Sequence, residues 1–134
     1  MNRLIARTIG ALAVALVIHV EAKDRGRTAS ADSEMFRAYC ASCHGVAGNG
    51  DGPVAPALRV PPSDLTTLAR RNGGRFPAVR VFQSIEGSAA FPAHGSREMP
   101  VWGTVFRQRS GSNEAQVKLR VRNLTNYIEA LQVK

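Results

Sequence analysis

The chain has little cysteine, few aromatic residues and no long hydrophobic run beyond its N-terminus. Only two of its 134 residues are cysteine, which excludes the disulfide framework of a small secreted scaffold. Aromatic residues make up 6% of the chain and its mean hydropathy is near neutral, which excludes an integral membrane bundle. The length suits one modest domain, so we do not expect a multidomain enzyme.

The beginning of the chain has the pattern of a secretory signal peptide. Two arginines precede an apolar run over residues 9–18, and Val20 and Ala22 suit the positions three and one before a cleavage site. Because the run is shorter than the ~20 apolar residues that span a bilayer, an uncleaved membrane anchor is the weaker alternative. We predict a signal peptide over residues 1–22 and one domain over residues 23–134, exported to the periplasm and not inserted in the membrane.

The predicted mature domain is basic. Cleavage removes two arginines and one glutamate from a chain of formal net charge +8, and leaves +7. A basic face attracts acidic partners, although the arginines are dispersed and scattered solubilising charge explains them equally well. No nucleic-acid-binding motif accompanies the charge, so no nucleic-acid partner is predicted.

Hydrophobic periodicity predicts an all-α domain of three or four helices joined by long loops. No segment alternates clearly like a strand, and glycine and proline crowd residues 45–62, which favours a functional loop there. Ser63 is the expected N-cap of the second helix, and residues 88–112 are expected to be irregular. The predicted helices cover residues 31–43, 64–71, 77–87 and 113–131.

The segment Cys40-Ala41-Ser42-Cys43-His44 carries the chemistry of the sequence. A zinc site would need a second ligand pair, and beyond this segment the mature chain offers only His94. A thioredoxin-like dithiol needs a βαβ context, which this chain lacks. Cys-x-x-Cys-His is the attachment pattern of a c-type haem, because both cysteines reach one side of a helical turn and His44 follows the second. One covalent haem c with its iron is therefore the predicted cofactor.

The ligand opposite His44 decides whether such a haem carries electrons or performs catalysis. Met35 lies five residues before Cys40, which is too close to reach the opposite face of the haem. Met99 and His94 remain, in a segment far along the chain. We favour Met99, because a soft thioether suits a high-potential carrier and Pro100 holds the backbone extended beside it.

Four motifs in the same order resemble those of the class I mono-haem c-type cytochromes, in particular small bacterial domains. The resemblance covers nearly the whole mature chain. The motifs are Tyr39-Cys40-Ala41-Ser42-Cys43-His44-Gly45, Gly48-Asn49-Gly50-Asp51-Gly52-Pro53, Pro62-Ser63-Asp64-Leu65 and His94-Gly95-Ser96-Arg97-Glu98-Met99-Pro100-Val101-Trp102-Gly103.

The resemblance implies a role for each matching residue. Cys40 and Cys43 would anchor the haem, and His44 and Met99 would be its proximal and distal iron ligands. The carbonyl of Pro53 would accept the free ring N–H of His44. Three further side chains would pair with the haem propionates: Arg59, Arg75 and Trp102.

The resemblance also implies contacts within the fold. Phe36 would pack against Leu124 and Tyr127 where the first and last helices cross. Where the family often has a glycine at this crossing, the chain has Ala31 and Asp32, so its helix packing there is expected to differ.

The implied function is electron transfer rather than catalysis. The leading hypothesis is a periplasmic carrier, monomeric or weakly associated, between a dehydrogenase or quinol-oxidising complex and an oxidase. One alternative is a haem subunit of such an oxidoreductase complex. Another is a haem sensor or peroxidase, which would need an open distal site.

Overall fold

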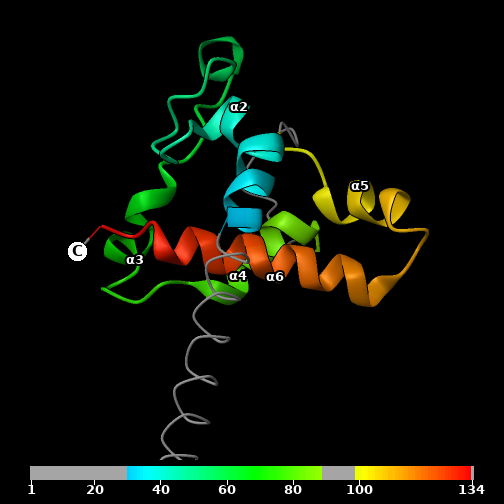
Figure 1. The fold of residues 1–134 in the computed structure, drawn as a ribbon. Coiled ribbons are helices and arrows are strands. Elements are labelled where there is room, and N and C mark those ends of the chain that lie inside the picture. The colour runs from blue at the N-terminus through cyan, green and yellow to red at the C-terminus, as the bar shows by residue number, and fades with distance from the viewer. Residues whose placement is uncertain (1–29, 89–98, 134) are drawn as a thin grey trace, which may run out of the picture. The chain divides into compact units, whose positions relative to one another are not determined.

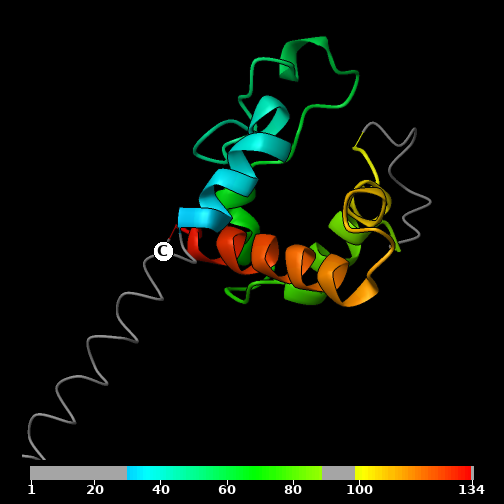
Figure 2. The same cartoon turned by 45° about the vertical axis from the view of Figure 1, so that its right-hand side comes forward.

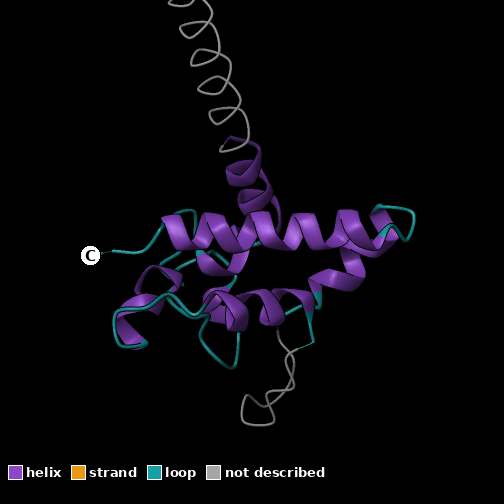
Figure 3. Cartoon of the chain, turned by 90° about the horizontal axis from the view of Figure 1, so that it is seen from below, coloured by secondary structure: helices purple, strands orange, loops and turns teal. Residues whose placement is uncertain are grey.

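Helices and loops make up the described chain (Figures 1 and 3). The computed structural model describes residues 30–88 and 99–133, and these two ranges contain no strand, so the all-α prediction is confirmed. Within them, no helix has both the length and the apolar character needed to cross a bilayer. The predicted signal peptide and His94 lie outside the described residues. All packing reported below belongs to the compact unit Asp32–Lys134.

The predicted helices are present, and two of them are divided. Residues 30–39 are helical, and a turn at Cys40 separates them from α2. The second predicted helix begins as a 3-10 turn, η2, and continues as α3. The remaining bounds are α2 (Ala41–His44), η1 (Ala55–Ala57), η2 (Leu65–Thr67), α3 (Leu68–Arg71), α4 (Ala78–Glu86), α5 (Trp102–Arg109) and α6 (Glu114–Ala130).

Helix α6 is the longest described helix and packs against α4, α5 and η2. The side chain of Asn113 accepts a hydrogen bond from the Gln116 amide (3.1 Å) and caps the helix. The spacing of apolar residues predicts a stripe along this helix; four of its members are at most 3% exposed, whereas the fifth, Leu131, is half-buried at the C-cap. These buried residues are Val117, Val121, Leu124 and Ile128.

The first described helix crosses α6, as expected (Figure 1). Phe36 is fully buried in the same core as Leu124, and its ring centroid lies 5.1 Å from that of Tyr127. At the crossing, Asn123 Nδ2 donates a hydrogen bond to Asp32 Oδ1 (3.0 Å). Asp32, which stands where the family often has a glycine, therefore links the two helices through a polar contact.

Helix α5 was not predicted, because residues 88–112 have little helical periodicity. Its sequence begins with tryptophan and glycine and includes two β-branched residues, none of which favours a helix strongly. Tertiary contacts stabilise it instead. Phe106 is fully buried, and a Cβ atom at Gly103 would lie 2.4 Å from the carbonyl oxygen of Glu86, so only glycine allows α5 to approach the end of α4 this closely.

The cap of the second predicted helix also differs from the expectation. Asp64 rather than Ser63 is the N-cap, and its Oδ1 accepts from the Thr66 amide (2.8 Å) and the Thr66 hydroxyl (2.6 Å). Ser63 is free of this role because the chain is still extended at Asp64 and the 3-10 turn begins one residue later. The carbonyl of Ser63 then has another partner, described next.

Candidate functional site

The segment from Cys40 to His44 forms one turn of helix, as its spacing predicts. The Cys40 amide donates to the Phe36 carbonyl (2.8 Å), and the His44 amide donates to the Cys40 carbonyl (2.9 Å). Both cysteines are free thiols, with Cys40 buried and Cys43 half-buried. Burial, reinforced by the nearby Cys43, raises the pKa of the Cys40 thiol to about 12. This sulfur therefore lies in the apolar surroundings that a haem edge would share.

His44 is oriented by a hydrogen bond to the backbone. Its Nδ1 lies 2.9 Å from the carbonyl oxygen of Ser63, and because a carbonyl oxygen only accepts, Nδ1 carries the proton and donates. Burial lowers the pKa of His44, an effect that the Ser63 hydrogen bond partly opposes. The ring is thus favoured in its neutral form, with the Nε2 lone pair left for a metal.

The acceptor of this bond differs from the one that the family resemblance implied. We expected the carbonyl of Pro53, but Pro53 is exposed and Ser63 accepts instead. The reason is the path of the loop, which comes back to His44 at Ser63, ten residues after Pro53. The Leu65 amide donates to the Gly48 carbonyl (2.7 Å), and a Cβ at Gly50 would lie 2.5 Å from the Pro62 carbonyl oxygen. Sequence reasoning missed Ser63 because a backbone acceptor leaves no side-chain signature.

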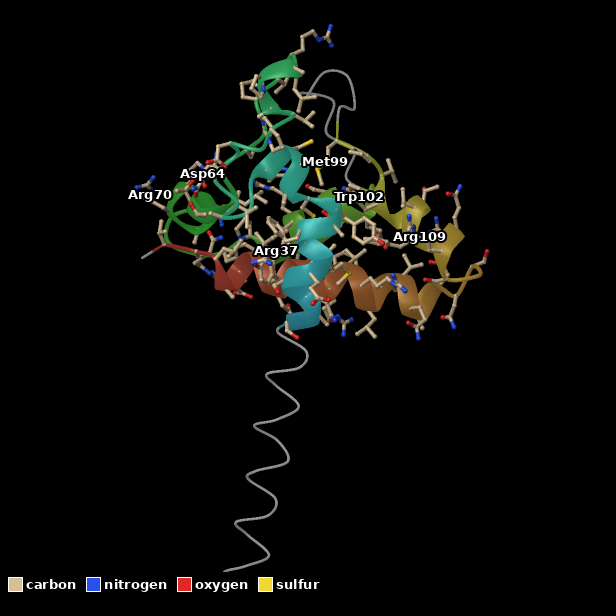
Figure 4. All side chains as sticks on the ribbon, turned by 45° about the horizontal axis from the view of Figure 1, so that its top comes forward. Arg37, Asp64, Arg70, Met99, Trp102 and Arg109 are labelled. Carbon is tan, nitrogen blue, oxygen red and sulfur yellow. The ribbon has the colours of Figure 1, made fainter. Side chains whose placement is uncertain are left out.

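Met99 lies on a separate part of the fold, just before α5. Its side chain is 40% exposed. Val101, two residues on, packs so closely on Gly87 that a Cβ there would lie 2.2 Å from Val101 Cγ1, which fixes the segment to the end of α4. Figure 2 shows α2 (cyan) and the segment that enters α5 (yellow) apart from each other, both above α6 (orange to red). In Figure 4, Asp64 lies on one side of α2, and Met99 and Trp102 lie on the other.

The residues expected at the propionates occupy different environments. The Trp102 ring packs in an aromatic cluster, 5.4 Å from the Tyr39 ring and 6.0 Å from the Phe106 ring between centroids. Arg59 and Arg75 are exposed. Nothing in the described residues tests their proposed pairing with propionates, which stays a prediction, as does iron ligation by His44 and Met99.

The residues present fit a covalent haem c. Two free thiols share one helical turn, and the adjacent His44 presents a neutral imidazole whose other nitrogen is already bonded. Apolar side chains are exposed on the loop that follows, namely Val46, Val54 and Val60. The zinc alternative gains no support, because no group of three histidine, cysteine or acidic residues gathers to hold a metal within residues 30–88 and 99–133.

Comparison with known proteins agrees with this geometry. The family model for cytochrome c matches residues 33–132, which is well over half of the chain. Searches of curated proteins and of solved structures gave no match. The matched range contains the Cys40–His44 turn, the loop that leads to Ser63, and Met99. The chain therefore belongs to the cytochrome c family, and covalent haem c with its iron is its cofactor.

Proposed function

We propose that this protein is a periplasmic electron carrier whose haem iron is held by His44 and Met99. The single observation that carries the proposal is the Cys40–His44 turn within a cytochrome c domain, with the His44 ring already oriented by Ser63. When bound, haem c supplies one-electron Fe(III)/Fe(II) chemistry.

The chain's own residues have distinct tasks in this proposal. Cys40 and Cys43 would hold the haem by thioether bonds, and His44 would bind the iron through Nε2 while its Nδ1–H continues to donate to the Ser63 carbonyl. Met99 would be the second protein ligand of the iron, and its thioether would keep water, O₂ and other small ligands away from the metal. With His44 and Met99 both holding the iron, the site would exchange electrons without binding a substrate.

The proposed partners are redox proteins with acidic docking surfaces. The predicted mature domain is basic, and exposed arginines occur on several elements, including Arg70 in α3 and Arg109 in α5 (Figure 4). Such a surface increases the rate of encounter with an acidic partner. A dehydrogenase or quinol-oxidising complex would donate electrons, and an oxidase would accept them.

The test begins with the holoprotein purified from its producing host after periplasmic extraction. We expect an N-terminus at Lys23, a monomer on size-exclusion chromatography, and reversible one-electron reduction. The ferrous wild type should not bind CO, whereas Met99→Ala should bind CO because one coordination position is then open. Met35→Leu is the control, since Met35 lies in the first helix and packs against the core.

Two results would contradict the proposal. Rapid CO binding by the wild type, with a spectrum that Met99→Ala leaves unchanged, would favour a sensor or peroxidase. Purification only with a larger catalytic protein would favour a subunit of an oxidoreductase complex.

A further inference from the structure

The side chain of Gln132 ties the end of the chain to the turn that follows Ser63. Its Oε1 accepts from the Ala69 amide (2.8 Å), and its Nε2 donates to the carbonyls of Leu65 (2.7 Å) and Ile128 (2.8 Å). Next to it, the Val133 amide donates to the Thr66 carbonyl (3.0 Å). Figure 1 shows this end of the chain running beside α3. One carboxamide thus uses both of its N–H groups and its oxygen to join α6 to residues 63–69.

Residues 63–69, here called the acceptor segment, contain the carbonyl that receives the His44 hydrogen bond. On one side, the segment is held to the loop after His44 by the Leu65 amide, which donates to Gly48. On the other side, the same Leu65 presents its carbonyl to Gln132. Leu65 is only two residues from Ser63, so a displacement at Leu65 reaches the Ser63 carbonyl through a short piece of backbone. Gln132 and Gly48 therefore hold the acceptor segment from opposite sides.

The position of the Ser63 carbonyl matters for the iron as well as for the fold. A hydrogen bond from the outer nitrogen of a ligating histidine makes the ring a stronger donor, because negative charge builds up on the imidazole. A stronger donor stabilises Fe(III) relative to Fe(II) and lowers the reduction potential. The bond weakens steeply as its 2.9 Å length grows or its angle closes. A small retreat of Ser63 is therefore enough to raise the potential.

We infer that Gln132 is a positioning residue for the haem iron: by fastening the acceptor segment to α6, it holds the Ser63 carbonyl on His44 Nδ1–H and keeps the reduction potential low. The inference rests on the proposed function, since it requires His44 to be the proximal ligand. It does not depend on which residue occupies the distal position.

The experiment compares purified holoproteins carrying Gln132→Leu and Gln132→Glu with the wild type. Leucine removes all three hydrogen bonds, whereas glutamate keeps an acceptor for the Ala69 amide but faces two carbonyl oxygens without a donor. Gln132→Glu also serves if the leucine variant yields too little holoprotein. Because Gly48 still holds Leu65, we expect a partial effect: at a fixed ambient potential, the Fe(III)/Fe(II) ratio falls at least threefold in Gln132→Leu. This corresponds to a rise of about 28 mV in the reduction potential of a one-electron couple.

Two controls separate this effect from general destabilisation. Gln116→Leu changes an exposed glutamine in the first turn of α6. Val117→Ala destabilises the buried core at the end of α6 remote from Gln132. Neither should change the potential, although Val117→Ala should lower the melting temperature. In the ferrous state, NMR provides a direct readout, because the His44 Nδ1–H proton should exchange with water about tenfold faster in Gln132→Leu than in either control.

The outcomes are distinct. A higher potential and faster Nδ1–H exchange in the Gln132 variants alone would support the inference. An unchanged potential in both Gln132 variants, or an equal shift in Val117→Ala, would overturn it and leave Gln132 a purely structural residue. If the wild type lacked histidine-ligated haem, the proposed function would fail first, and that result is visible before any variant is made.

Discussion

The hydrogen bond that orients His44 has a backbone carbonyl, rather than a side chain, as its acceptor. The donor is His44 Nδ1–H, and the acceptor is a carbonyl that every residue type possesses. The Ser63 side chain is exposed and is not the group that His44 contacts. The site requires that the backbone at residue 63 passes close to His44. The absence of a side chain at Gly50 allows this, because Gly50 lies directly against the Pro62 carbonyl. The identity of residue 63 matters less than where its carbonyl lies.

At the same scale, Met99 offers a test of the distal ligand. Replacing Met99 by histidine exchanges a weak thioether donor for a stronger nitrogen donor, which stabilises Fe(III). We expect the reduction potential of Met99→His to fall well below that of the wild type, as measured by a spectroscopic redox titration. His94→Ala should barely move it. A large shift in the His94 variant, with none in Met99→His, would exchange the two assignments.

Asp64 gives a prediction about pH. The pKa of its carboxyl is lowered, chiefly by the Thr66 hydroxyl that donates to it. A group whose pKa is lower in the folded state contributes stability that is present above its unfolded pKa, about 3.9, and is lost as the pH falls through the folded value. Below about pH 4, the wild type should therefore lose more stability than Asp64→Asn, which cannot titrate. Urea unfolding of both proteins across this range measures the difference, and parallel pH profiles would refute the assignment.

At the scale of the elements, helices α6 and α5 are stabilised by different factors. Helix α6 has an N-cap, 17 residues and a continuous buried stripe, so local pattern and packing agree. Helix α5 has eight residues, no side-chain cap and only Gly103 and Phe106 buried. Its contacts with α4 and with the ring of Tyr39 compensate for weak local preference. The segment that carries Met99 is thus positioned by packing.

The central role of α6 predicts a strong effect at Leu124. This residue is fully buried where α6 meets the first helix, so Leu124→Ala should lower the free energy of unfolding by about 2–5 kcal/mol. Leu119 on the same helix is 51% exposed, and Leu119→Ala should change it by less than about 0.5 kcal/mol. Denaturant unfolding monitored by circular dichroism compares the two. Equal effects would mean that the buried face of α6 is assigned wrongly.

At the scale of the whole molecule, the loops are organised around one site. The helical turn at Cys40 leads into a loop that returns to His44 at Ser63, and the end of the chain fastens the acceptor segment through Gln132. Residues more than 60 positions apart in sequence therefore meet in the segment that holds the hydrogen-bond acceptor of His44. Covalent attachment of the haem would join this assembly at Cys40 and Cys43.

The attachment itself is the prediction at this scale. In the double variant Cys40→Ser, Cys43→Ser, neither residue can form a thioether, so acidified organic solvent should extract all of the haem, whereas the wild type should retain it. Each single variant should retain haem through one remaining bond. Absorbance of the extracted and protein-bound fractions measures the outcome, and retention of haem by the double variant would disprove attachment at these cysteines.

The sequence by itself determined the features that depend on local spacing. The Cys40–His44 turn, the stripe on α6 and the breaks at Gly45 and Gly87 follow from the helical period and from residues with strong backbone preferences. The tertiary structure alone decided that Ser63 rather than Pro53 accepts from His44, that residues 102–109 form a helix, and that Gln132 holds the acceptor segment. The reason is physical: these features depend on contacts between residues far apart in the chain, and neither backbone acceptors nor glycine close contacts leave a periodic pattern.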